Sequence, residues 1–134
     1  MKALSIRQPY AWLIVNGLKP LENRSWYTDL RGTILIHAPK QPALTKNEYK
    51  KLRQAVYEDF GIWMPANLES LPYGGIVGKV DLVDCVDHVT DDADLIWHEP
   101  GSYAFVFANP QKLPFTPMPG QLKFFEVHSR LLRQ

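Results

Sequence analysis

The apolar residues of this chain occur in short runs of strand length, which glycines and prolines separate. None of these runs approaches the roughly 20 apolar residues that a membrane-spanning helix needs, so we expect no membrane segment. The 11 prolines stand singly and end elements instead of forming a linker. A length of 134 residues suits one domain whose core needs neither metal nor disulfide. We therefore expect residues 1–134 to form a single domain.

Six segments have the composition of β-strands. They are residues 3–6, 21–26, 32–37, 74–87, 103–107 and 123–127. The segment 32–37 is β-branched and apolar on both faces, which predicts a position inside a sheet. Apolar residues change sides near Val83, so we expect the segment 74–87 to bend or bulge there.

Two main helices are predicted between these strands. Residues 9–16 are apolar nearly all round, so this helix must be packed on every side. Residues 45–60 begin with a capping box of Thr45 and Glu48 and end at Gly61. Short connections between the strands favour an α+β fold that is mainly β: a small, largely antiparallel barrel with helices at its ends.

Cysteine and histidine give little support for a metal site or a disulfide. Cys85 is the single cysteine, and we interpret it as a packing residue, with no disulfide-linked partner. The four histidines lack the spacing of zinc ligands, and no phosphate-binding loop is present, so we expect no cofactor. Asp91, Asp92 and Asp94 are interpreted as caps of a helical turn. Arg7 interrupts the apolar start of the chain, which argues against a secretory signal and for the cytoplasm.

The charges divide the chain into three parts. Residues 1–60 carry a net charge of +5, residues 61–100 carry −7 and residues 101–134 carry +3. If the two basic parts meet in the fold, they form a positive face that attracts polyanions. The alternative is that the charges only solvate separate surfaces. Four basic residues follow one side of the predicted helix 45–60 and are candidate RNA contacts: Lys46, Lys50, Lys51 and Arg53.

The segment 17–24 concentrates charges of both signs between a helix and a strand. Its sequence, Gly17-Leu18-Lys19-Pro20-Leu21-Glu22-Asn23-Arg24, matches the pattern GxKxxExR. Alternation places Glu22 and Arg24 on one strand face but Lys19 on the other. Pro20 cannot donate to a strand ladder and favours a bend. We expect this bend to bring all three side chains into one cleft.

This pattern resembles the signature of the ASCH family, within the PUA-like superfold. Further segments also resemble the family, in the same order: residues 4–11, 32–38, 78–85 and 101–106. The resemblance covers residues 3–127 and implies a PUA-like barrel with a cleft for RNA or a modified nucleobase. Family members include RNA-binding modules, coactivator-associated domains, a ribonuclease and amidohydrolases that deacetylate acetylcytidine nucleosides. In the amidohydrolases, a threonine proposed as the nucleophile stands at the position that Glu22 occupies here. This chain therefore lacks that threonine.

The three motif residues suit ligand recognition. Arg24 can clamp a phosphate or a base edge, Glu22 can accept from an exocyclic amine, and Lys19 can bind phosphate or polarise a carbonyl. The carboxylate favours the charged ammonium, so the motif suits an electrostatic clamp better than a general base. If the protein is an enzyme, Lys19 and Glu22 are its candidate catalytic residues.

Four further residues are candidates for ligand binding. Ser5 and Gln8 flank the turn into the first helix, where free N–H groups can hold an anion or simply cap the turn. His37 ends a buried strand, where a histidine is more often a core residue with its hydrogen bonds satisfied than a ligand. Tyr103 begins a buried strand and can stack on a base or pack. Trp26 and Trp97 offer the same stacking. Trp12 and Trp63 are expected in the core.

These residues favour an RNA- or nucleoside-binding protein. One alternative is a metal-independent hydrolase acting on acetylcytidine-type nucleosides or on RNA. Another is a protein-interaction adaptor whose docking surface is the acidic segment between Glu69 and Glu99.

Overall fold

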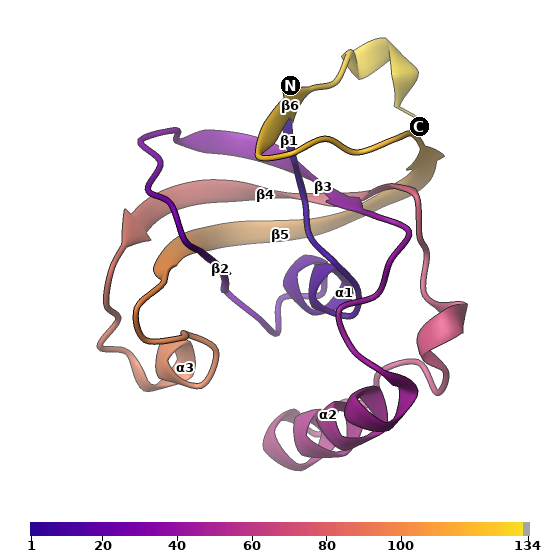
Figure 1. Cartoon of the computed structure of the whole chain (residues 1–134), viewed down its shortest axis with the longest axis vertical. Helices are drawn as coiled ribbons and strands as arrows, with labels where there is room; N and C mark the ends of the chain where they lie inside the picture. Colours follow the sequence, from indigo (N-terminus) through magenta and orange to yellow (C-terminus); the bar gives the residue numbers. More distant parts are fainter. Residues whose placement is uncertain (133–134) are drawn as a thin grey trace.

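A six-stranded curled sheet forms the body of the molecule in the computed structural model, which describes residues 1–132. The strands are β1 (Lys2–Ser5), β2 (Leu21–Arg24), β3 (Gly32–Ala38), β4 (Gly75–Val86), β5 (Tyr103–Pro117) and β6 (Phe124–Glu126). Their order across the sheet is β2-β5-β4-β3-β1-β6. The pair β1–β3 is parallel and the other four pairs are antiparallel. The fold is mainly β, as the sequence predicts, and its sheet curls into a half-barrel (Figure 1).

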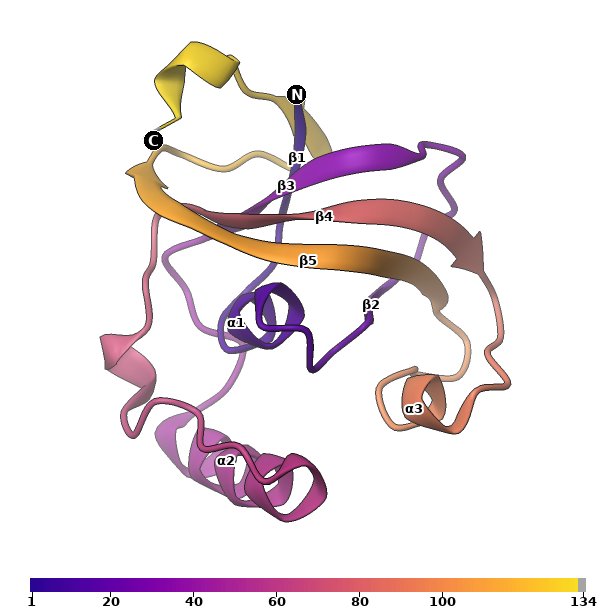
Figure 2. The same cartoon turned by 180° about the vertical axis from the view of Figure 1, so that it is seen from behind.

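The helices lie on one side of this sheet (Figures 1 and 2). They are α1 (Tyr10–Val15), α2 (Lys46–Phe60) and the short α3 (Asp92–Leu95). Two 3-10 turns also occur: Leu68–Ser70 lies between α2 and β4, and Ser129–Leu131 follows β6 across the sheet from these helices (Figure 1). Thr45 and Glu48 form the predicted capping box of α2, and Gly61 ends that helix with a φ of 69°. The Asp91 side chain accepts from the Ala93 N–H at the start of α3, which confirms the predicted cap.

The helix α1 is buried between two apolar layers, as its all-round apolar sequence predicts. Ala11, Ile14 and Val15 pack against the sheet with Ile34 and Ile36 of β3, among others. Leu13 belongs to a second cluster with Tyr49 and Val56 of α2. Figure 2 shows α1 between the sheet and α2. Burial of α1 on both sides fixes the segments that precede and follow it, and both contribute to the site described below.

The predicted positions of β3 and the bend of β4 are confirmed. β3 lies between β4 and β1. Its residues Ile34 and Ile36 face one apolar cluster, and Leu35 faces another on the opposite side of the sheet. The register between β4 and β5 shifts three times, once between Leu82 and Asp84, where the sequence predicts the bend.

Two expectations are corrected by the structure. β5 extends to Pro117, ten residues beyond the predicted end at Phe107. Trp63 is 47% exposed and is therefore not a core residue, because its ring stacks on the surface against Tyr57 of α2, with centroids 3.9 Å apart. Trp12 is half-buried against the cluster around Leu13.

Within residues 1–132, no helix is long and apolar enough to cross a membrane. Over the same residues, no three His, Cys, Asp or Glu side chains gather where they can hold a metal ion. Cys85 is buried and has a free thiol.

Candidate functional site

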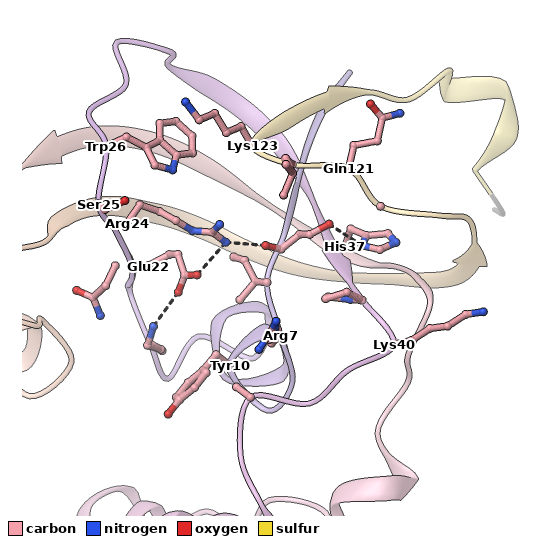
Figure 3. Close-up of a pocket in the computed structure, with 18 of the residues that line it drawn as sticks. Arg7, Tyr10, Glu22, Arg24, Ser25, Trp26, His37, Lys40, Gln121 and Lys123 are labelled. Carbon is pink, nitrogen blue, oxygen red and sulfur yellow. Dashed lines mark hydrogen bonds and ion pairs between the residues drawn. The ribbon is translucent and has the colours of Figure 1, made fainter.

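A cavity of about 1480 Å³ opens beside the motif segment. Its walls come from the end of β1, the strand β2, the segment following α3, and the loop 117–123 between β5 and β6 (Figure 3). α2 contributes Leu52 to the lining. The cavity therefore collects residues from both ends of the sequence, which the curled sheet brings to one side.

Lys19, Glu22 and Arg24 meet in this cavity, as the sequence predicts. The Glu22 carboxylate accepts a hydrogen bond from the Lys19 ammonium through Oε1 at 3.2 Å and forms an ion pair with the Arg24 guanidinium through Oε2 at 3.0 Å. Glu22 and Arg24 point the same way from β2 because strand residues two apart share a face. Each carboxylate oxygen therefore has its own cationic partner (Figure 3).

Lys19 reaches this cluster from the turn before β2. Its side chain is 4% exposed, and its ammonium also donates to the Leu21 carbonyl at 3.0 Å. The same ammonium lies 5.0 Å from the centre of the Tyr10 ring. Burial and the Glu22 and Glu99 carboxylates raise the pKa of Tyr10. Because all these contacts are made within the protein, Lys19 holds Glu22 in place. The side chains of Glu22 and Arg24 are more exposed than that of Lys19 and are therefore more accessible to a ligand.

Arg24 connects the motif to the first strand. Its Nη2 donates to the Ser5 carbonyl at 2.6 Å and is also the atom that forms the ion pair with Glu22. Its Nε is buried and has no hydrogen-bond partner among the described residues. The guanidinium is thus fixed on two sides while part of it faces the cavity.

Ser5 and His37 form a hydrogen-bonded pair in the cavity wall. They are register partners on the parallel strands β1 and β3. The Ser5 Oγ lies 2.9 Å from the His37 Nδ1, and the His37 Nε2 lies 2.8 Å from the Met118 carbonyl oxygen. Burial lowers the pKa of His37, although the hydrogen bond to Met118 acts in the opposite direction.

Three cationic side chains of the cavity were not singled out from the sequence as ligand contacts: Arg7, Lys40 and Lys123. Arg7 follows β1, Lys40 follows β3, and Lys123 comes from the loop before β6. Together with Lys19 and Arg24 they make five cationic side chains in the lining, against the carboxylates of Glu22 and Glu99. No sequence pattern marks these three, because the fold alone brings them to the cavity.

The aromatic lining consists of Tyr10, Trp26 and Trp97. The Lys123 ammonium lies 5.1 Å from the centre of the Trp26 ring. The sequence predicts Trp26 and Trp97 as stacking candidates, whereas it indicates Tyr10 only as part of a packed helix.

Two predicted ligand-binding residues lie outside this cavity. Gln8 is fully buried, and both ends of its amide are used: Oε1 accepts from the Trp12 N–H and Nε2 donates to the Pro72 carbonyl. Tyr103 pairs with Arg24 across β2 and β5, and its ring packs edge-on against Tyr27. Gln8 is therefore a structural residue, and Tyr103 is not part of the cavity lining.

The basic residues of α2 form a separate surface. Lys50, Lys51 and Arg53 surround a shallow hollow beside Trp63, and Lys46 approaches Glu69 at 3.9 Å. Arg53 is partly committed to the protein, because its Nε donates to the Met64 carbonyl at 2.7 Å and its guanidinium lies 4.5 Å from the centre of the Trp63 ring.

Comparison with known proteins identifies the family. A family model described as "ASCH domain" matches residues 4–115. The chain belongs to the ASCH domain family. ASCH domains are generally associated with RNA binding. This chain resembles Activating signal cointegrator 1 of Mus musculus at 31% identity and its Homo sapiens counterpart at 30% identity, each over 138 residues. These alignments cover 96% of this chain and 22% of each relative, so the chain spans about a fifth of their length.

Solved structures share the fold of this ASCH domain. The crystal structure of ASCH from Zymomonas mobilis superposes with a TM-score of 0.55 at 13% sequence identity, covering 97% of this chain and 89% of that chain. A mutant form of the same Zymomonas mobilis protein gives the same TM-score at 12% identity and 91% coverage of that chain. At such low identity the likeness concerns the half-barrel and its helices.

Proposed function

We propose that this ASCH domain binds RNA, or a nucleoside derived from it, in the cavity beside Lys19, Glu22 and Arg24. The observation that carries the proposal is the composition of the cavity wall, which combines five cationic side chains with three aromatic rings. Single-stranded nucleic acids are bound by this combination, because cations follow the phosphates and aromatic rings stack on the bases. The family membership supports the same class of ligand.

The roles of the individual groups follow from their surroundings. Arg7, Lys40 and Lys123 line the cavity and are the groups we assign to phosphate contacts. Glu22 and Arg24 lie side by side and offer an acceptor next to a donor, which is the pattern that matches the edge of a nucleobase. Lys19 neutralises Glu22 in this arrangement, so a ligand meets little net negative charge there.

For an RNA longer than the cavity, we extend the proposal to Lys46, Lys50 and Lys51. These side chains are exposed on α2 and do not line the cavity. A short oligonucleotide should therefore not depend on them, whereas a long one should.

Fluorescence anisotropy with labelled single-stranded RNA tests this proposal. The affinity should fall with salt, with a slope of about 0.7 for each phosphate contacted. The triple variant Arg7→Ala/Lys40→Ala/Lys123→Ala should bind at least roughly 10-fold more weakly and with a smaller slope. Substitution of Lys46, Lys50 and Lys51 by alanine should weaken only the long RNA.

The matched control removes three lysines that do not line the cavity, as Lys2→Ala/Lys79→Ala/Lys112→Ala. It lowers the net charge by the same amount, so it measures the non-specific effect of charge. Equal losses in the two triple variants, or an affinity that does not change with salt, would contradict the proposal.

A further inference from the structure

The Ser5–His37 pair has a geometry that RNA binding does not require. A carbonyl oxygen only accepts hydrogen bonds, so the His37 Nε2 must carry the proton that it shares with the Met118 carbonyl at 2.8 Å. In the neutral imidazole, Nδ1 is then unprotonated and must accept the proton of the Ser5 hydroxyl at 2.9 Å. The main chain of Met118 thus selects the tautomer that faces Ser5 with a basic nitrogen.

The position of His37 favours its neutral form. The residue is 1% exposed, and burial disfavours the charged imidazolium. A hydroxyl, a neutral imidazole and a third group that orients the imidazole are the components of an activated serine nucleophile. Because Met118 supplies a backbone carbonyl as the orienting group, no acidic residue is needed, and spacing in the sequence gives no sign of the arrangement.

The Ser5–His37 pair also has access to the cavity, since both residues line it. A Cβ atom placed on Gly120 would lie 2.5 Å from the Ser5 Oγ and 2.6 Å from the His37 Cε1. The main chain of Gly120 therefore packs directly against the Ser5–His37 pair, and any side chain at this position would overlap the hydroxyl and the imidazole. Arg24 holds the main chain of Ser5 through its carbonyl at 2.6 Å and brings a positive charge to the same wall.

We propose that Ser5 is an acyl-accepting nucleophile with His37 as its general base, and that the protein hydrolyses small carboxylic esters in this cavity. The Ser5 Oγ attacks the ester carbonyl while His37 Nδ1 takes the hydroxyl proton. Collapse of the tetrahedral intermediate breaks the bond to the leaving alkoxide or phenoxide, which receives that proton. In the second half of the reaction, water attacks the acyl-serine carbonyl while His37 Nδ1 takes a proton from it. Collapse of this intermediate breaks the bond to Ser5 Oγ, which receives the proton back from His37, and the carboxylic acid is released. The cationic wall favours esters whose leaving half carries a negative charge.

The experiment uses 4-nitrophenyl acetate and 5-acetoxy-2-nitrobenzoate, the same ester with an added carboxylate. We expect release of the coloured phenolate, faster for the anionic ester, and an acetyl group on Ser5 located by peptide mass spectrometry. Ser5→Ala should lose the acetyl group and at least about 100-fold of the rate, the lower range for a lost nucleophile and base pair. Gly120→Ala should also block the reaction, because its methyl would collide with the Ser5 Oγ and the His37 ring and force the pair apart.

Two controls protect this test. His88→Gln removes an imidazole whose side chain is 81% exposed and that can hydrolyse such esters without a site; its rate should equal that of the wild type. Ser5→Cys keeps a nucleophile of similar size and should still be acetylated, which separates loss of the nucleophile from loss of the fold. Acetylation confined to lysines, or a Ser5→Ala rate equal to that of the wild type in a folded protein, would overturn the proposal. Because the proposal does not depend on RNA binding, failure of one leaves the other unaffected.

Discussion

At the scale of single residues, the Glu22 carboxylate is the centre of the candidate site. It is 13% exposed and has a cation at 3.2 Å on one oxygen and another at 3.0 Å on the other. Removing a carboxylate or a cation from water is costly, and a buried pair recovers that cost only while both partners are present. Loss of one partner should therefore affect stability more than loss of an exposed ion pair.

Lys19→Met should lower the free energy of unfolding by about 2 to 3 kcal/mol. The substitution leaves Glu22 with Arg24 as its single cationic partner and leaves the Leu21 carbonyl without the ammonium. This value lies below the loss expected for a fully isolated buried charge, since Arg24 remains in place. Urea denaturation followed by tryptophan fluorescence measures the change.

Lys46→Met is the matched control for this substitution. The Lys46 side chain is 82% exposed and its distance to Glu69 is 3.9 Å, so its loss should change stability by no more than about 0.5 kcal/mol. The double variant Lys19→Met/Glu22→Gln should lose less than the sum of the two single losses. Additive losses would show that the two groups do not stabilise each other.

At the scale of elements, the sequence predicts the positions of all six strands but not the length of β5. The strand contains Pro110, Pro114 and Pro117, and prolines in a sequence usually indicate loops. β2 pairs only with residues 103–106, so the later part of β5 has β4 on one side and no strand on the other among the described residues. Proline is tolerated at such an edge because its missing N–H is not needed there.

The candidate site is predictable from the sequence only where its residues are close together in the chain. Lys19, Glu22 and Arg24 fall within six positions and share a turn and a strand, so local geometry was enough to predict that they meet. The sequence indicates Ser5 and His37 as separate candidates, but their pairing depends on the parallel register of β1 and β3. Gln8 has a polar side chain of the kind that binds ligands, so the sequence indicates it as a candidate. Its full burial depends on how α1 packs in the fold, which the sequence pattern does not show.

The close packing of α1 on β4 at Gly78 is a further element-scale feature. A Cβ atom at this position would lie 2.5 Å from the Val15 side chain and 2.5 Å from the Gln111 carbonyl oxygen. Gly78→Ala should therefore lower stability by about 1 to 3 kcal/mol through overpacking. Thermal and urea unfolding, each followed by circular dichroism, measure this loss.

Val15→Ala should partly compensate for Gly78→Ala, because it removes one of the two groups that the new methyl meets. The double variant should then be more stable than the sum of the single effects predicts, by at least about 0.5 kcal/mol. Compensation should be incomplete, since the Gln111 carbonyl belongs to the main chain of β5. A double variant with strictly additive losses would mean that α1 does not press on β4 at this point.

At the scale of the whole molecule, the fold brings the basic ends of the sequence together. Arg7, Lys19, Arg24 and Lys40 come from the first basic part and Lys123 from the last, and all five line one cavity. The acidic middle part contributes only Glu99 from its carboxylates to the same wall. The charge pattern therefore predicts the positive face, although the alternative of separate solvated surfaces still describes the basic side of α2.

The stability of the whole molecule should also depend on pH through His37. Burial lowers the pKa of His37 below that of an unfolded histidine, near 6.5. Between the two pKa values the unfolded chain binds a proton that the folded chain does not, so stability should fall as the pH drops from about 7 to 5. Carboxyls whose pKa is lowered by hydrogen bonds, such as Asp81 and Glu48, lose their contribution only below about pH 4.5.

Urea denaturation of the wild type and of His37→Gln separates these effects. It is measured at several pH values from about 8 to about 5, the range in which histidine titrates. At the upper end, His37→Gln should be less stable than the wild type, because the hydrogen bonds to Ser5 and Met118 are weakened. Toward the lower end the two curves should converge, since glutamine has no proton to gain on unfolding. Parallel curves over this range would mean that another group carries the pH dependence, and the neutral, hydroxyl-facing imidazole on which Ser5 activation depends would lose its support.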